Sequence, residues 1–175
     1  MTEQEEREAV VREALSWQRT PYHHNARVKG GGVDCAMLLA EVYPKIVPHR
    51  VPPITPEHYP PDWHLHRSKE RYLTYVQKYA VEITEAEAQP GDMVLFKFGR
   101  CFSHGAIIVK WPRIIHAYVN LGCQLDDANG AHFLRYQGEA DNAPRLRRFF
   151  TLWPSAPAEP QNAQDPPKTP LEGGL

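Results

Sequence analysis

Hydrophobic positions recur with the period of an α-helix in three stretches of the first half of the chain. The first predicts a helix from about Glu3 to Gln18, which opens on a capping-box spacing at Thr2 and Glu5. The second predicts a helix from Cys35 to about Ile46. The third predicts an amphipathic helix capped by Ser68. Each carries one apolar stripe, so all three helices are expected to pack on a common core.

The second half of the chain alternates short apolar runs with turn residues, a pattern typical of strands. Strands are expected at 93–96, 103–109, 114–119, 131–136 and 145–153, and residues 81–88 are expected to form a connection. Because the helices come first and the strands second, the sequence predicts an α+β fold. In it, the helix that begins at Cys35 packs on an antiparallel sheet of about five strands.

Proline-rich segments lie within and beyond this expected domain. Residues 1–153 are expected to form one domain, an ordinary size for a chain of 175 residues. Residues 154–175 are rich in proline and small polar side chains, so we expect a tail that is disordered or ordered by a partner. The insert at 47–67 is expected to be an irregular connection. Four histidines of this insert have no carboxylate or cysteine at a ligand spacing, so no metal site is expected: His49, His58, His64 and His66.

Composition excludes several classes of partner. The chain has 20 basic and 21 acidic side chains and a net charge of −1, without long blocks of either sign, so neither nucleic acid nor an anionic membrane surface is expected to bind. No apolar run approaches the ~20 residues that span a bilayer. The acidic N-terminus lacks the pattern of a secretory signal, so the chain is expected to be made and kept in the cytoplasm or to leave by another route. Three cysteines without regular spacing predict reduced thiols.

Cys35 is the candidate nucleophile. Three glycines, Gly30 to Gly32, precede it, and the expected helix places its thiol in the first turn. Unpaired backbone N–H groups and the helix dipole there are expected to lower the pKa of the thiol from its usual ~8.5. A small buried hydrophobic role is the alternative, and this stretch alone leaves both open.

Two histidines supply the other groups that an activated thiol needs. His104 begins one expected strand and His116 lies in the next, so an antiparallel pairing brings them close together. His104 is then the general base for Cys35, and His116 orients its ring. The alternative is a pair of strand histidines whose hydrogen bonds are satisfied by neighbours.

Five segments resemble the NlpC-like cell-wall peptidases, which are papain-like cysteine enzymes. They are Thr20-Pro21-Tyr22, Gly31 to Leu38, Gln89 to Phe96, Ser103 to Val109, and Ile114 to Ala117. Their order is that of the family. The resemblance runs from about Thr20 to Ala117, more than half of the chain.

The resemblance implies a papain-like α+β core and cleavage of amide bonds in peptidoglycan stem peptides, commonly between D-glutamate and a diamino acid. Cys35 matches the nucleophile, His104 the base and His116 the third polar residue. Tyr22 matches a tyrosine that supports substrate or oxyanion binding, and Asp34 an acidic residue that orders the site. No cofactor is implied. The backbone N–H of Cys35 is a further candidate donor to the oxyanion.

Two positions depart from the family pattern. Ala36 stands where the family usually has serine, and Gly105 stands where it usually has valine. The first removes a hydroxyl beside the nucleophile, so it bears on substrate binding. The second changes the packing next to the base.

The compact form resembles members encoded by tailed bacteriophages. This resemblance implies a protein made in the bacterial cytoplasm, incorporated in a phage tail tip or hub, and acting on the cell wall during entry. Two other classes stay open at this point. One is a structural or scaffolding tail protein that keeps the fold with little catalysis. The other is a different thiol enzyme, such as an acyltransferase, because nucleophile and base would be the same.

Overall fold

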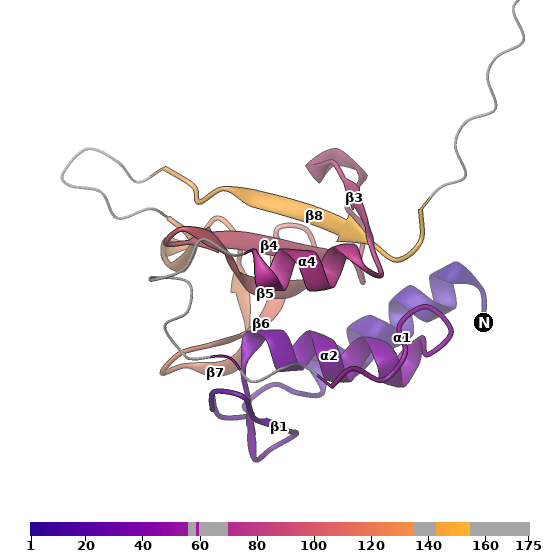
Figure 1. Ribbon diagram of the computed structural model, residues 1–175, viewed down its shortest axis with the longest axis horizontal. Coiled ribbons are helices and arrows are strands. Elements are labelled where there is room, and N and C mark those ends of the chain that lie inside the picture. Colours follow the sequence, from indigo (N-terminus) through magenta and orange to yellow (C-terminus); the bar gives the residue numbers. More distant parts are fainter. Residues whose placement is uncertain (56–58, 60–69, 135–142, 155–175) are drawn as a thin grey trace, which may run out of the picture.

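The computed structural model of the protein describes residues 1–55, 59, 70–134 and 143–154. Within these residues, three α-helices and a six-stranded antiparallel sheet form the fold, together with one small two-stranded ribbon (Figure 1). Several expectations fall outside the described residues: the cap at Ser68, the proline-rich tail beyond Pro154, and the insert histidines His58, His64 and His66.

The helices are α1 (Glu3–Leu15), α2 (Cys35–Ile46) and α4 (Arg71–Gln77). α2 has the predicted bounds, and the capping box at the start of α1 is confirmed. α1 ends three residues earlier than expected, and the chain leaves it through Arg19, whose φ of +67° cannot continue a helix. None of the described helices is long and apolar enough to cross a membrane.

The sheet has the strand order β3-β8-β4-β5-β6-β7, and every neighbouring pair is antiparallel. Its strands are β3 (Val81–Ile83), β4 (Met93–Phe98), β5 (Cys101–Lys110), β6 (Arg113–Tyr118), β7 (Gly122–Asp127) and β8 (Arg147–Thr151). The ribbon pairs β1 (Arg27–Val28) with β2 (Gly32–Val33), just before α2. The predicted α+β class is therefore confirmed, with one strand more than expected.

Two strand predictions were wrong. The strand expected at 131–136 is absent from its described part, where Ala131–Phe133 forms a single 3-10 turn. The last strand on that side is β7 instead, an edge strand whose polar sequence Gly-Cys-Gln-Leu-Asp-Asp gives no apolar run to recognise. β3, at the other edge, lies in the segment expected to be a connection, because its short and largely exposed strand lacks an apolar pattern.

Each face of the sheet packs against its own hydrophobic core. Successive residues of a strand point to opposite faces, so neighbouring side chains join different cores. Met93 and Leu95 of β4 face the helices, together with Ile107 of β5. The intervening positions Val94 and Phe96 face a second cluster that includes Phe133 from the turn after β7. α2 and α4 both contact β5, so the first core lies between these helices and the middle of the sheet.

A buried arginine connects α1 to the sheet through hydrogen bonds. Arg7 donates to the carboxylate of Asp92 across 2.8 Å, to the carbonyl oxygen of Pro90 across 3.1 Å, and to the hydroxyl of Thr151 across 3.2 Å. Arg7 and Asp92 are both almost fully buried. The first helix is thereby tied to the entrance of β4 and to the end of β8.

Candidate active site

Asp34 determines where α2 begins. Its Oδ1 accepts hydrogen bonds from the backbone N–H groups of Ala36 and Met37, at 3.1 and 2.9 Å, which satisfies two N–H groups of the first turn. The ribbon strand β2 ends at Val33, so the chain passes directly from a strand through the cap into the helix. Cys35 is therefore held at the first helical position, as the sequence predicts.

The other oxygen of Asp34 binds the loops on both sides of α2. Oδ2 accepts from the backbone N–H of Asn25 at 2.8 Å and from the hydroxyl of Tyr59 at 2.7 Å. His24 lies 3.7 Å from the same oxygen. Asp34 is almost fully buried, so these contacts replace the hydrogen bonds that water would make with its carboxylate. These contacts hold the backbone on both sides of Cys35, and the role of Asp34 in a reaction stays a prediction.

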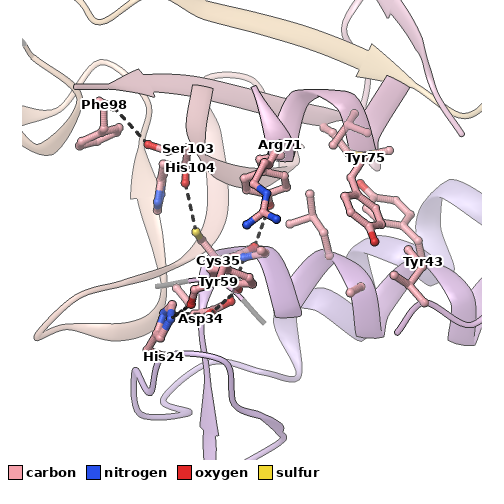
Figure 2. A pocket seen from close by; sticks show the side chains of 18 of the residues that line it. His24, Asp34, Cys35, Tyr43, Tyr59, Arg71, Tyr75, Phe98, Ser103 and His104 are labelled. Carbon is pink, nitrogen blue, oxygen red and sulfur yellow. Dashed lines mark hydrogen bonds and ion pairs between the residues drawn. The ribbon is translucent and has the colours of Figure 1, made fainter. Parts of the chain in front are cut away.

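The thiol of Cys35 is aimed at the strand that carries His104. Sγ donates to the carbonyl oxygen of Ser103 across 3.8 Å, and this is its only side-chain hydrogen bond in the described part of the chain (Figure 2). The sulfur thus contacts the residue immediately before His104, and no direct hydrogen bond to the His104 ring forms. A thiol has a single proton to donate, so a hydrogen bond to His104 would replace the one to Ser103.

The thiol pKa departs from the sequence prediction. Burial raises the pKa of Cys35 to about 12, and the negative charge of Asp34 acts in the same direction. The backbone N–H groups near the helix start and that of Gly105 oppose this shift, but they do not overcome it. The expectation of a lowered pKa was wrong, because tertiary burial outweighs the helix-start effect. A pKa in this range favours the protonated thiol at neutral pH.

His104 and His116 are joined directly, as the strand pairing predicts. Nε2 of His104 lies 2.8 Å from Nδ1 of His116, and the two rings cross at 88°. His104 is on β5 and His116 on β6, and both are buried. Because Nε2 of His104 is engaged with His116, its Nδ1 is the nitrogen left for a proton from the thiol.

Both histidines are neutral at physiological pH. Burial lowers the pKa of His104 well below its ordinary value, with further contributions from His116 and Arg145. Burial also lowers the pKa of His116 to about 4, although Asp126 acts against this shift. A neutral His104 is the form that can accept a proton.

One cavity of about 380 Å³ connects the predicted site residues and runs along α2 (Figure 2). Cys35, His104, Tyr22 and Asp34 line it, whereas His116 supports His104 from behind. Tyr22 stays protonated, because burial and nearby charges raise its pKa, so it is available as a hydrogen-bond donor. The rest of the lining is mainly apolar and aromatic, including Leu39, Tyr43, Val51, Tyr72, Tyr75 and Tyr79.

Tyr72 lies on the helix that the sequence analysis expected only to pack on the core. Its hydroxyl donates to the backbone carbonyl of Cys35 across 3.0 Å. The same hydroxyl lies 2.1 Å from the place where a β-carbon on Gly105 would stand. The departure from the family valine at Gly105 therefore makes room for Tyr72. A glycine inside a strand was the available signal for this close approach.

Tyr59 and Ser103 also belong to the site, although neither was predicted as a catalytic or supporting residue. Tyr59 lies in the proline-rich insert, and its contact with Asp34 joins positions that are 25 residues apart in sequence. Ser103 contributes its backbone oxygen, which any residue carries, so no sequence signal marks it. In the described residues, no group of three or more histidine, cysteine or acidic side chains is placed to hold a metal ion.

A cysteine at the start of a helix, packed on an antiparallel sheet with two linked histidines, defines a papain-like α+β protein. The comparison with protein families identifies the branch. Residues 19–140 match the NlpC/P60 family, and the chain belongs to this family. A search of curated protein sequences found no match.

Solved structures of the same family share the fold. The NlpC/p60 domain of the peptidoglycan hydrolase SagA is 19% identical and has a TM-score of 0.51, with 69% of this chain and 88% of that chain covered. The peptidoglycan hydrolase RipB from Mycobacterium tuberculosis is 13% identical and has a TM-score of 0.54, with 87% of this chain and 67% of that chain covered.

A third similar structure is RipD from Mycobacterium tuberculosis, described as a non-catalytic NlpC/p60 domain protein adapted to peptidoglycan binding. It is 13% identical, with a TM-score of 0.51 and 85% and 98% of the two chains covered. The family fold thus occurs with and without catalysis, and activity depends on the residues of each site.

Proposed function

We propose that the protein is a peptidoglycan hydrolase that cleaves an amide bond in murein stem peptides, between D-glutamate and the diamino acid. The observation that carries this proposal is the arrangement of three side chains. Cys35 and His104 line one cavity, and His104 is held by His116 at 2.8 Å. Membership of the NlpC/P60 family supports the choice of substrate class.

The proposed reaction begins when the thiol of Cys35 turns from Ser103 and passes its proton to Nδ1 of His104. Sγ then attacks the amide carbonyl carbon, and the backbone N–H of Cys35 stabilises the oxyanion. The protonated His104 gives its proton to the leaving amine as the carbon–nitrogen bond breaks. Water, deprotonated by His104, hydrolyses the thioester and restores the thiol. Tyr22 is placed in the same cavity to hold substrate.

The test is digestion of purified muropeptides that end in either meso-diaminopimelate or lysine, followed by mass spectrometry. Wild-type protein is expected to release fragments cut after D-glutamate, and Cys35→Ala to release none. Cys123→Ala is the matched control, because Cys123 is a buried thiol outside the cavity. Release by Cys35→Ala equal to wild type would refute the proposal.

We also propose that the protein acts as a component of a bacteriophage tail tip or hub, which brings it to the cell wall during entry. The sequence resemblance to tail-associated members supports this role. Purified virions are expected to contain the protein in fixed stoichiometry with tail proteins. Its absence from virions, with the protein found only in host cytoplasm, would refute the tail role and leave the hydrolase proposal standing.

A catalytically weak scaffolding protein is the second candidate, and two observations favour it. The resting thiol is protonated and bonded to Ser103, and the similar protein RipD is described as non-catalytic. This candidate predicts no turnover of any muropeptide together with tight binding to tail proteins. An acyltransferase, which the apolar cavity favours, predicts transfer of an acyl group to an added amine in preference to water.

A further inference from the structure

A carboxylate lies behind the second histidine, on the last strand of the sheet. Oδ2 of Asp126 is 3.4 Å from Nε2 of His116. The same oxygen is 2.7 Å from Nδ1 of His132, in the turn that follows β7. The groups therefore form a continuous row from the cavity outward: His104, His116, Asp126 and His132.

The strand register explains how Asp126 reaches His116. In the β6–β7 pair, Gln124 stands directly opposite His116, and Asp126 is two residues further along β7. Residues two apart project from the same face of a strand, so Asp126 is the diagonal neighbour of His116. The side chain of His116 is fully buried, whereas that of Asp126 is 18% exposed. The carboxylate sits between the buried imidazole and the surface.

Nε2 of His116 is a buried polar atom without a hydrogen bond of good geometry in the described residues. Oδ2 of the Asp126 carboxylate lies 3.4 Å from this nitrogen. A proton on this nitrogen meets a negative charge, whereas a lone pair there would face that charge and be repelled. The position of Asp126 thus favours the Nε2–H form of a neutral His116.

The form of His116 determines the form of His104. When His116 carries its proton on Nε2, its Nδ1 presents a lone pair to His104, which must then donate from Nε2. A neutral His104 with its proton on Nε2 has a free lone pair on Nδ1. In the opposite arrangement His104 carries its proton on Nδ1 and cannot accept one from a thiol.

We propose that Asp126 is a positioning residue that fixes the proton arrangement of both histidines, so that Nδ1 of His104 is ready to act as the base. The effect on turnover rests on the proposed hydrolase function, but the proton arrangement is a property of the resting protein. His132 holds the carboxylate in place from its outer side.

Independent contacts keep Asp126 ionised. Its Oδ1 accepts from the backbone N–H of Asp127 across 2.7 Å, and its Oδ2 accepts from His132. Although burial acts to raise it, these hydrogen bonds hold the pKa of Asp126 below its ordinary value. The other titratable or charged groups near the histidine pair are Tyr118 on β6, His132 after β7, and Arg145 before β8.

The first test is the nitrogen-15 NMR spectrum of the wild-type imidazoles at pH 7.5, with His104→Gln and His116→Gln for assignment. We expect protons on Nε2 of both His104 and His116 and an unprotonated Nδ1 on each. A proton on Nδ1 of His116 would overturn the proposal. This measurement needs no substrate, so it decides the proton arrangement even where no muropeptide is cleaved.

The second test compares Asp126→Ala with Asp127→Ala, the neighbouring carboxylate on the same strand, in wild-type background. We expect Asp126→Ala to lower kcat by about 10- to 100-fold with KM within about twofold, and to mix the two proton arrangements in the NMR spectrum. Asp127→Ala is expected to match wild type in both. A folded Asp126→Ala protein with wild-type kcat and spectrum would overturn the proposal, and the wild-type spectrum alone decides it if this variant does not fold.

Discussion

The thiol of Cys35 donates to the carbonyl oxygen of Ser103, the residue that immediately precedes the predicted base His104. The thiol thus contacts the neighbour of the predicted base, and burial raises the pKa of the thiol to about 12. Substrate binding would have to release the thiol from this contact before His104 can take its proton.

This resting state predicts slow alkylation of Cys35 at neutral pH. Because its pKa is raised to about 12, the thiolate fraction is small at pH 7. The rate of alkylation by iodoacetamide is therefore expected to rise about tenfold per pH unit, up to the pH at which the protein unfolds. Mass spectrometry of the labelled peptide measures the rate, with Cys35→Ala as the background. A rate that levels off below pH 8 would contradict the raised pKa of the thiol.

The buried histidine pair predicts a loss of stability in mild acid. The folded protein holds His116 with a pKa of about 4, against 6.5 for an ordinary histidine, so the unfolded chain binds more protons between these values. The stabilisation is complete above pH 6.5 and is lost as the pH falls towards 4. At about 1.4 kcal/mol per pKa unit, the loss from His116 amounts to about 3 kcal/mol.

Urea unfolding at pH 7.5 and pH 4.5 measures this loss. His104 contributes in the same direction, since burial also lowers its pKa. The matched control is His116→Gln, which removes one of the two buried imidazoles and is expected to reduce the pH dependence. An unchanged difference between the two pH values in this variant would show that His116 is not the group responsible.

The close approach of Tyr72 to β5 predicts that Gly105 tolerates no side chain. A β-carbon there would lie 2.1 Å from the Tyr72 hydroxyl and 2.7 Å from the ring carbon that carries it, so Gly105→Ala must displace the ring. We expect a loss of about 1–3 kcal/mol in the free energy of unfolding, as for other overpacked sites. The hydrogen bond from Tyr72 to Cys35 would break as well.

A double-mutant cycle with Tyr72→Ala isolates this clash. Tyr72→Ala alone is expected to destabilise the protein through the cavity it leaves, but Gly105→Ala added to it is expected to cost far less than in wild type. Chemical denaturation of the four proteins gives the coupling. Additive effects of the two substitutions would show that the ring and the glycine do not constrain one another.

The buried pair of Arg7 and Asp92 predicts a large effect of a single substitution in the first helix. Arg7→Ala leaves a buried carboxylate without its cation, and we expect a loss of about 3–5 kcal/mol in unfolding free energy. Arg12→Ala, on the same helix, is the control, because Arg12 is 70% exposed and 3.9 Å from Glu8. Its effect is expected to stay below about 1 kcal/mol.

Local signals allowed the helix that begins at Cys35 to be predicted with its correct bounds. Three glycines precede Cys35, and the apolar stripe that follows has one period throughout. The contact between the two histidines was predictable for a similar reason. A tight turn between two antiparallel strands allows few ways to pair them, so residues on the two strands near the turn lie close together. Both inferences depend on residues close to one another in sequence.

The features that were missed depend on distant segments. The thiol pKa reflects a tertiary structure in which β5 and Tyr72 of α4 contact the start of α2. The helix start alone suggests the opposite shift. β7 is polar because it lies at the edge of the sheet, so its pattern resembles that of a loop. Its Asp126 could not be connected with His116 without knowing that β7 pairs with β6.

The two oxygens of Asp34 join three pieces of backbone: the loop before α2, the first turn of α2, and the insert after it through Tyr59. A protein engineer who wished to move this helix into another scaffold would have to transplant all three pieces together.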